Sequence, residues 1–104
     1  MSTPGPPLLR DDLVERAARR FRVLGDPVRL RLLNAMRVRG ELSVQALMDE
    51  TDQRQANVSK HLGILARDGL VQRRREGTSV YYSLSDPSLP GVCLLVAKEV
   101  EAIG

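Results

Sequence analysis

Residues 43–68 read SVQALMDETDQRQANVSKHLGILARD, and this stretch decides the predicted fold. Ser43 can cap a short helix that ends near Glu50, because a serine side chain accepts a hydrogen bond from the free amides of a first turn. A polar turn follows, and a second helix is expected over residues 55–68, closed by Gly69 in the left-handed conformation that ends many helices. Two helices around a short turn form a helix-turn-helix unit.

Two further helices are expected ahead of this unit. The first covers residues 11–24, begins at a capping box of Asp12 and Glu15, and stops at a left-handed Gly25. An Asp-Pro pair at 26–27 opens the second, because an aspartate cap followed by a first-turn proline favours a helix start.

A β-hairpin, or wing, is expected over residues 70–84, where apolar and polar residues alternate in the second strand. Residues 89–103 are expected to form a last helix that is apolar on nearly all sides. Such a helix must be buried on more than one side, and a domain this small can cover only one of them. A second copy of the chain is therefore predicted to cover the other. The residues expected at this dimer interface are Leu13, Ala17, Val92, Leu95, Val96, Val100 and Ile103.

The predicted fold class is mainly α with a small β-hairpin: a dimeric winged helix-turn-helix in the order α-α-α-α-β-β-α. The 104 residues fit one domain, with residues 1–10 as a flexible N-terminal lead and residues 11–104 as the folded domain. Within the domain, the helix-turn-helix covers about 43–68 and the wing 70–84. The dimerisation helices are those at about 11–24 and 89–103.

Composition excludes several classes of protein. No apolar run approaches the ~18 residues of a membrane span, and the N-terminus lacks the basic start and apolar stretch of a secretory signal. We expect a cytoplasmic, nucleoid-associated protein without membrane contact. A single cysteine, Cys93, cannot form an internal disulfide. No cofactor and no enzymatic activity are predicted, because one cysteine, one histidine and scattered carboxylates supply no nucleophile with a positioned base.

Basic charge is concentrated in one part of the chain. Residues 54–75 hold six lysines and arginines against one acidic residue, although the whole chain has a net charge of only +3. Charged runs are often just solvated faces, but here a capped helix precedes the run and an arginine-rich hairpin ends it. One face of the 55–68 helix carries small, polar or basic residues that suit an approach to base edges. These are Gln55, Ala56, Ser59, Lys60, Gly63 and Arg67.

Four segments in combination resemble the ArsR/SmtB repressors: FRVLGDPVRLRLL at 21–33, ELSVQAL at 41–47, NVSKHL at 57–62 and the hairpin through Tyr81 and Tyr82. The resemblance covers residues 13–103. It implies a dimer, joined by its first and last helices, that binds operator DNA near its own promoter. It also implies that Gln55, Ala56, Ser59 and Lys60 read the major groove, and that Arg73, Arg74 and Arg75 contact the backbone or the minor groove.

The chain departs from this family in its sensing residues. Many members bind metals or arsenicals through an ELCxC pattern, and residues 41–45 here read ELSVQ. A second family site draws on acidic residues and histidines of the last helix, and residues 89–103 contain no histidine. No metal site is predicted. For His61 a hydrogen-bonded structural role is favoured over metal ligation. Cys93 is interpreted as a small buried hydrophobic residue, with a thiol sensor as the alternative.

The predicted function is sequence-specific transcriptional regulation by a homodimeric repressor of an inverted-repeat operator in double-stranded DNA. One alternative is a metal- or redox-responsive sensor that uses a non-standard site, an unidentified effector or a separate sensing partner protein. A second is an architectural protein that binds any DNA sequence, and a third is an interaction module that uses the fold without DNA.

Overall fold

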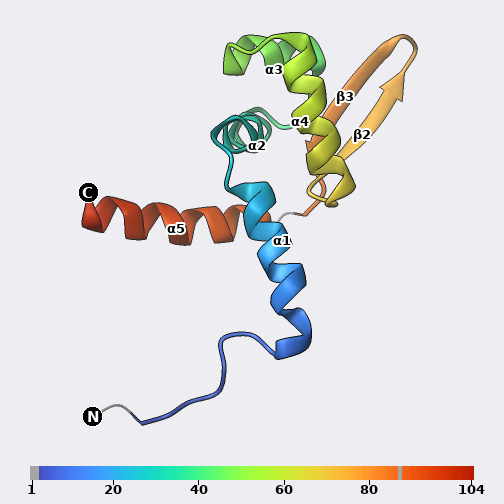
Figure 1. Cartoon of the computed structure of the whole chain (residues 1–104). Coiled ribbons are helices and arrows are strands. Elements are labelled where there is room, and N and C mark those ends of the chain that lie inside the picture. Colours follow the sequence, from blue (N-terminus) through green and yellow to red (C-terminus); the bar gives the residue numbers. More distant parts are fainter. Residues whose placement is uncertain (1–2, 87) are drawn as a thin grey trace.

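The computed structural model describes residues 3–86 and 88–104. Helices α2, α3 and α4 gather at one end with the β2–β3 hairpin beside them, while α1 and α5 extend away from this group (Figure 1). The predicted order of helices and hairpin is confirmed, with one additional short strand. The elements are a 3-10 turn at Asp11–Leu13, α1 at Val14–Leu24, α2 at Pro27–Arg39, β1 at Leu42–Ser43, α3 at Val44–Thr51, α4 at Gln55–Arg67, β2 at Val71–Glu76, β3 at Ser79–Leu84 and α5 at Leu89–Ile103.

Side-chain caps begin α2 and α3, as the sequence predicts. Asp26 Oδ1 accepts a hydrogen bond of 3.0 Å from the backbone N–H of Arg29, and Pro27 occupies the first turn. Ser43 Oγ accepts one of 3.1 Å from the N–H of Ala46. Because each cap satisfies an amide that has no partner within its helix, both helices start at a defined residue.

The end of α4 also follows the prediction. Gly69 has a φ of 76°, its N–H donates to the Ala66 carbonyl, and the N–H of Leu70 donates to the Leu65 carbonyl at 2.9 Å. This pair of hydrogen bonds is the Schellman motif. It turns the chain so that the buried Leu70 packs into the core just before β2.

Two predictions about α1 are wrong. Asp12 does not cap the helix. Its carboxylate pairs with Arg10 at 3.3 Å, and α1 starts at Val14 without a side-chain cap. Gly25 has a φ of −82°, so it is not left-handed. The Arg29 side chain already binds carbonyls in the last turn of α1, and this replaces the left-handed motif. A glycine still suits this position, because an added Cβ would lie 3.1 Å from the Phe21 carbonyl oxygen.

The sheet has three antiparallel strands in the order β1-β3-β2, whereas the sequence predicted two. Leu42 of β1 lies opposite Tyr82 of β3. The connection between β2 and β3 is a two-residue turn at residues 77–78, since Glu76 and Ser79 pair with each other across the ladder. Gly77 begins this two-residue turn with a φ of 61°, a conformation that strongly favours glycine.

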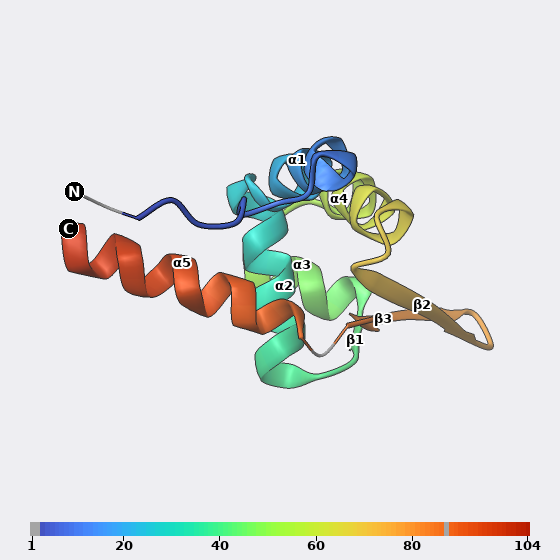
Figure 2. The same ribbon diagram turned by 90° about the horizontal axis from the view of Figure 1, so that it is seen from below.

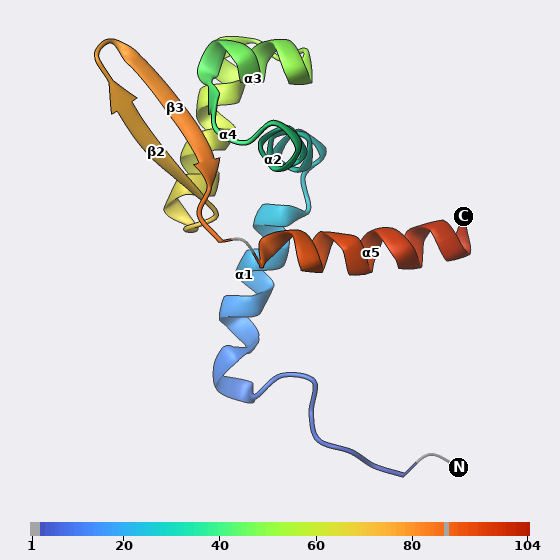
Figure 3. The ribbon, with the colours of Figure 1, turned by 180° about the vertical axis from the view of Figure 1, so that it is seen from behind.

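The core lies between α2, α3, α4 and the start of β2. Its fully buried side chains include Val58, Leu62 and Leu65, which form the inner face of α4. Apart from Leu89, the described side chains of α5 are not buried in the single chain, and Figure 3 shows this helix leading away from the core. Residues 3–10 of the predicted lead form no helix or strand, and residues 1–2 lie outside the described residues. No helix in the described part of the chain is long and apolar enough to span a membrane.

Candidate nucleic-acid interface

Six small, polar or basic residues were predicted on one face of the 55–68 helix, and they lie together on the outer face of α4, the candidate recognition helix. Five of them are exposed, while Gly63 is half-buried. Val58, Leu62 and Leu65 anchor the opposite face in the core, so the outer face has a fixed direction. The exposed residues are Gln55, Ala56, Ser59, Lys60 and Arg67.

The start of α4 has no side-chain cap. Arg54 occupies the cap position, and its side chain accepts no hydrogen bond from the first turn. Asn57 Nδ2 donates instead to Gln53 Oε1 at 2.6 Å, which ties the turn to the helix. Arg54 is exposed beside Gln55 and was not among the predicted contacts. Its basic side chain just before the helix is the only feature of the sequence that could have indicated a DNA contact there.

The alternation of β2 divides the three wing arginines between its two faces. Arg73 and Arg75 lie opposite Tyr82 and Val80, and thus on the same face as the buried Val71. Arg74 lies on the other face, opposite Tyr81. All three arginines are exposed, but their surroundings differ.

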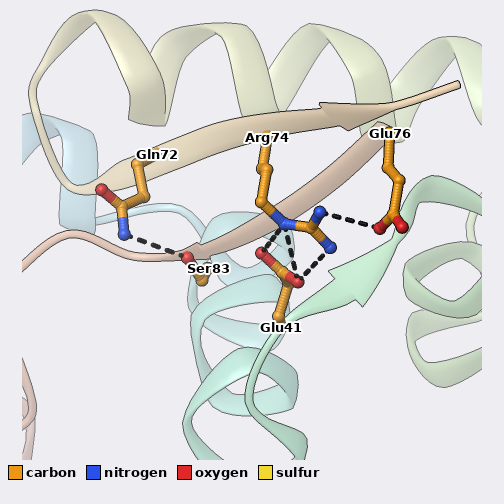
Figure 4. A network of polar contacts seen from close by, with 5 residues as sticks. All are labelled: Glu41, Gln72, Arg74, Glu76 and Ser83. Carbon is orange, nitrogen blue, oxygen red and sulfur yellow. Dashed lines mark hydrogen bonds and ion pairs between the residues drawn. The ribbon is translucent and has the colours of Figure 1, made fainter. Parts of the chain in front are cut away.

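Arg74 is held by two carboxylates (Figure 4). Its Nη2 and Nε donate to Glu41 at 2.7 and 3.0 Å, and its Nη1 donates to Glu76 at 2.8 Å. The guanidinium also lies 4.9 Å from the centre of the Tyr81 ring. Hydrogen bonding to Arg74 lowers the pKa of Glu41, and the two carboxylates raise the pKa of Arg74. The charge of Arg74 is thus offset locally, and its side chain joins the wing to the segment before β1.

The residues predicted at the dimer interface fall into two groups. Leu13 and Ala17 line a groove beside Arg20 and Asp68, on the side of α1 that faces the end of α4. The α5 residues form an exposed apolar surface, extended by Leu94, which the prediction did not include. The exposed fractions are 42% for Val92, 61% for Leu94, 66% for Leu95, 51% for Val96, 61% for Val100 and 89% for Ile103.

An apolar groove of about 520 Å³ separates α5 from the junction of α1 and α2. Phe21 and Leu30 line it from one side and Val96 from the other. Phe21 is 59% exposed although it is large and apolar. The helical periodicity of the sequence placed Phe21 only within the first helix, so its exposure is a finding of the structure.

The chain's only cysteine and only histidine lie in different places. Cys93 is half-buried and lines the same groove, so the expected full burial is not found in the single chain. His61 is buried, with its Nδ1 3.1 Å from Nη1 of Arg29. Burial lowers the pKa of His61. Within residues 3–86 and 88–104, no three histidines, cysteines or acidic residues cluster closely enough to hold a metal ion.

Comparison with known proteins adds to this geometry. A family of helix-turn-helix domains matches residues 24–74. The chain is 37% identical over 82 residues to an uncharacterised HTH-type transcriptional regulator of Methanocaldococcus jannaschii, a match that covers 79% of this chain and 92% of the relative. It is 41% identical over 96 residues to the transcriptional repressor SmtB homolog of Synechocystis, covering 92% of this chain and 72% of the relative.

Solved structures of transcriptional regulators have the same fold as this chain. The solution structure of a homodimeric winged helix-turn-helix DNA-binding domain from Mycobacterium bovis, a possible ArsR-family transcriptional regulator, superposes with a TM-score of 0.76. The two sequences are 28% identical, and the match covers 95% of this chain and 91% of that one. The crystal structure of Rv0081 from Mycobacterium tuberculosis matches with a TM-score of 0.75 and 33% identity, covering 89% of this chain and 92% of that chain.

Proposed function

Because the chain belongs to the ArsR/SmtB family of DNA-binding transcriptional regulators, we propose that it is a repressor that binds an inverted-repeat operator as a homodimer. The observation that carries this proposal is the exposed face of α4. Five side chains suited to base edges and phosphates lie there, next to a wing whose first strand carries three arginines.

The dimer follows from α5. Its apolar side chains are exposed along much of the helix, and Figures 1 and 3 show that it extends away from the rest of its own chain. Soluble monomers rarely expose an apolar surface of this extent. A second copy related by two-fold symmetry would cover α5 and the groove beside Phe21.

The DNA contacts divide into two kinds. Gln55 and Ser59 can hydrogen-bond to base edges, and Ala56 lets the helix approach them closely. Lys60 and Arg67 can reach guanine or a phosphate. In the wing, we assign phosphate or minor-groove contacts to Arg73 and Arg75, while Arg74 holds the wing in place through Glu41.

Two measurements test the repressor directly. Sedimentation at micromolar concentration should show a dimer, and footprinting of the DNA upstream of the protein's own gene should show an inverted repeat. Its half-sites should lie about one helical turn, ~34 to 36 Å, or a multiple of it apart. Equal affinity for every duplex would support an architectural protein instead. No binding to any duplex at low salt would support an interaction module.

Substitutions test the base-reading assignment. Gln55→Ala and Ser59→Ala should each reduce the difference in binding free energy between operator and scrambled DNA by ~1 to 3 kcal/mol. Ser85→Ala is a control that removes the same hydroxyl as Ser59→Ala, because Ser85 is exposed just after β3 and lies outside the proposed contact set. An equal loss on both DNAs from Gln55→Ala would contradict the assignment.

A further inference from the structure

Arg29 lies where three helices meet. From the first turn of α2, its Nε donates to the Val23 carbonyl at 2.6 Å and its Nη2 donates to the Arg22 carbonyl at 3.2 Å. Both carbonyls belong to the last turn of α1. The third nitrogen, Nη1, lies 3.1 Å from Nδ1 of His61 in α4. One side chain therefore joins the end of α1 to the recognition helix.

The chemistry of this contact fixes its direction. A guanidinium only donates hydrogen bonds, so the ring nitrogen of His61 that faces it must accept, and the ring proton must lie on Nε2. Arg29 uses all three nitrogens of its planar group in different directions. A lysine ammonium carries the same charge, but it cannot place donors in this fork.

His61 occupies a sensitive position on α4. It lies at one boundary of the buried face, where Leu65, one turn further along, is fully buried and Ile64 is half-buried. A polar contact at this boundary resists rotation of α4 about its own axis. Such a rotation would move the proposed base-reading side chains sideways. The apolar core opposes it less, because hydrophobic contacts have no preferred direction.

A second arginine contact joins the same two helices. Arg20 of α1 donates from Nε to Asp68 Oδ2 at 2.7 Å and from Nη2 to the Asp68 carbonyl at 3.2 Å, at the end of α4. The Asp68 side chain is only 10% exposed. Figure 2 shows α1 and α4 between α5 on one side and the β2–β3 hairpin on the other. α4 is therefore linked to α1 at two points, at His61 through Arg29 of α2 and at its C-terminal end through Arg20.

We propose that Arg29 is a positioning residue for DNA reading, which couples the placement of α1 to the orientation of α4 through His61. The last turn of α1 carries Phe21 and Leu24, which line the groove that we assign to the second copy. Dimer assembly would thus fix the helix end to which Arg29 is bound. The inference rests on the proposed homodimeric repressor and adds a specific link between its interface and its reading helix.

The test compares Arg29→Lys with Arg31→Lys, an exposed position on the same helix. The probe is an inverted-repeat duplex that the wild-type protein selects from a random pool, measured beside a scrambled duplex. Arg29→Lys should remain folded by circular dichroism and dimeric by sedimentation. It should bind the selected duplex about tenfold more weakly, which corresponds to about 1.4 kcal/mol, with unchanged affinity for the scrambled one. Arg31→Lys should bind both duplexes with wild-type affinity.

His61 provides a second test, which decides the matter if Arg29→Lys does not fold. Asn keeps an acceptor close to the position of Nδ1 and Leu removes it, so His61→Asn should retain operator preference and His61→Leu should lose it. Equal behaviour of the two His61 variants would overturn the proposal. A folded Arg29→Lys protein with wild-type operator affinity would also overturn it. So would an Arg29→Lys protein whose affinity falls equally for the selected and the scrambled duplex. A wild-type protein that selects no inverted repeat, or that sediments as a monomer, would instead contradict the proposed function.

Discussion

Arg74 and Arg75 are adjacent in sequence and carry the same charge, but they should contribute differently to DNA binding. Arg74 is paired with Glu41 and Glu76, while no carboxylate among the described residues pairs with Arg75. Arg75→Gln should weaken binding to operator and scrambled DNA alike. Because log K falls as the salt concentration rises, the loss of one phosphate contact should make the slope of log K against log salt about 0.9 less negative. Arg74→Gln should change this slope less. Titration at several salt concentrations measures both, and equal slopes for the two variants would contradict the division of the wing.

His61 should make stability depend on pH. Burial lowers its pKa most, Arg29 and Lys60 lower it further, and Asp26 opposes them. In the unfolded chain the ring protonates near its ordinary pKa of about 6.5. The unfolded state therefore binds the proton first as the pH falls. The free energy of unfolding should decrease below about pH 6.5, as protonation of Nδ1 also removes the acceptor that faces Arg29.

Urea denaturation at several pH values between about 7.5 and 5.5 measures this dependence. His61→Asn cannot titrate in this range, so it serves as the control and should show a flatter profile. Asp26 also has a lowered pKa, but a carboxylate titrates at more acidic pH. Identical profiles for the wild type and His61→Asn would assign the dependence to other groups.

At the scale of the elements, the helix-turn-helix depends on how α3 begins. Ser43→Ala removes the oxygen that accepts from the Ala46 N–H and should lower the free energy of unfolding by about 1 kcal/mol. Ser79→Ala is the matched control, because Ser79 is exposed at the start of β3 and caps no helix. Its effect should stay within about 0.5 kcal/mol. Equal denaturation midpoints for both variants would show that the cap contributes nothing.

Elements with local signals were the ones that the sequence could predict. Asp26 and Ser43 cap helices through amides three residues away, and Gly69 ends α4 through contacts within the same turn. β1 has no such signal. It has two residues and exists only because Leu42 pairs with Tyr82, far along the chain.

The candidate site shows the same division. The outer face of α4 follows from helical periodicity, so its five exposed residues could be predicted. The different surroundings of Arg74 could not, because Glu41 lies 33 residues away in the chain. For the same reason the contact between Arg29 and His61, 32 residues apart, emerged only from the structure.

At the scale of the whole molecule, DNA binding should require the surface of α5. Leu95 is 66% exposed on this helix, and Leu95→Glu would place a charge in the proposed interface, where burial without a partner is costly. The variant should sediment as a folded monomer and lose most of its operator affinity, because it presents one recognition helix instead of two. Lys98→Ala on the same helix controls for the loss of a surface side chain. A Leu95→Glu protein that remains a dimer would place the interface elsewhere.

The isolated protein should also bind its operator without regard to thiophilic metals. Cadmium, lead and arsenite need clustered thiolates, zinc and nickel sites usually draw on histidine, and each chain has one cysteine and one histidine. His61 is buried against Arg29, a cation that disfavours a metal there, and Cys93 lies on another helix. Two-fold symmetry could still bring two Cys93 thiols together across α5.

Operator affinity measured with and without stoichiometric zinc, nickel, cadmium or arsenite tests this expectation. Cys93→Ser and His61→Asn each remove one possible metal ligand, and His61→Asn keeps the acceptor that faces Arg29. The wild type should respond to none of the four ions. A tenfold change in affinity, about 1.4 kcal/mol of coupling, would contradict the prediction. Its disappearance in Cys93→Ser would place the sensor at the thiols of the dimer. If operator binding responds to a signal in the cell but not to these ions in isolation, the response must come from an effector of different chemistry or from a separate sensing protein.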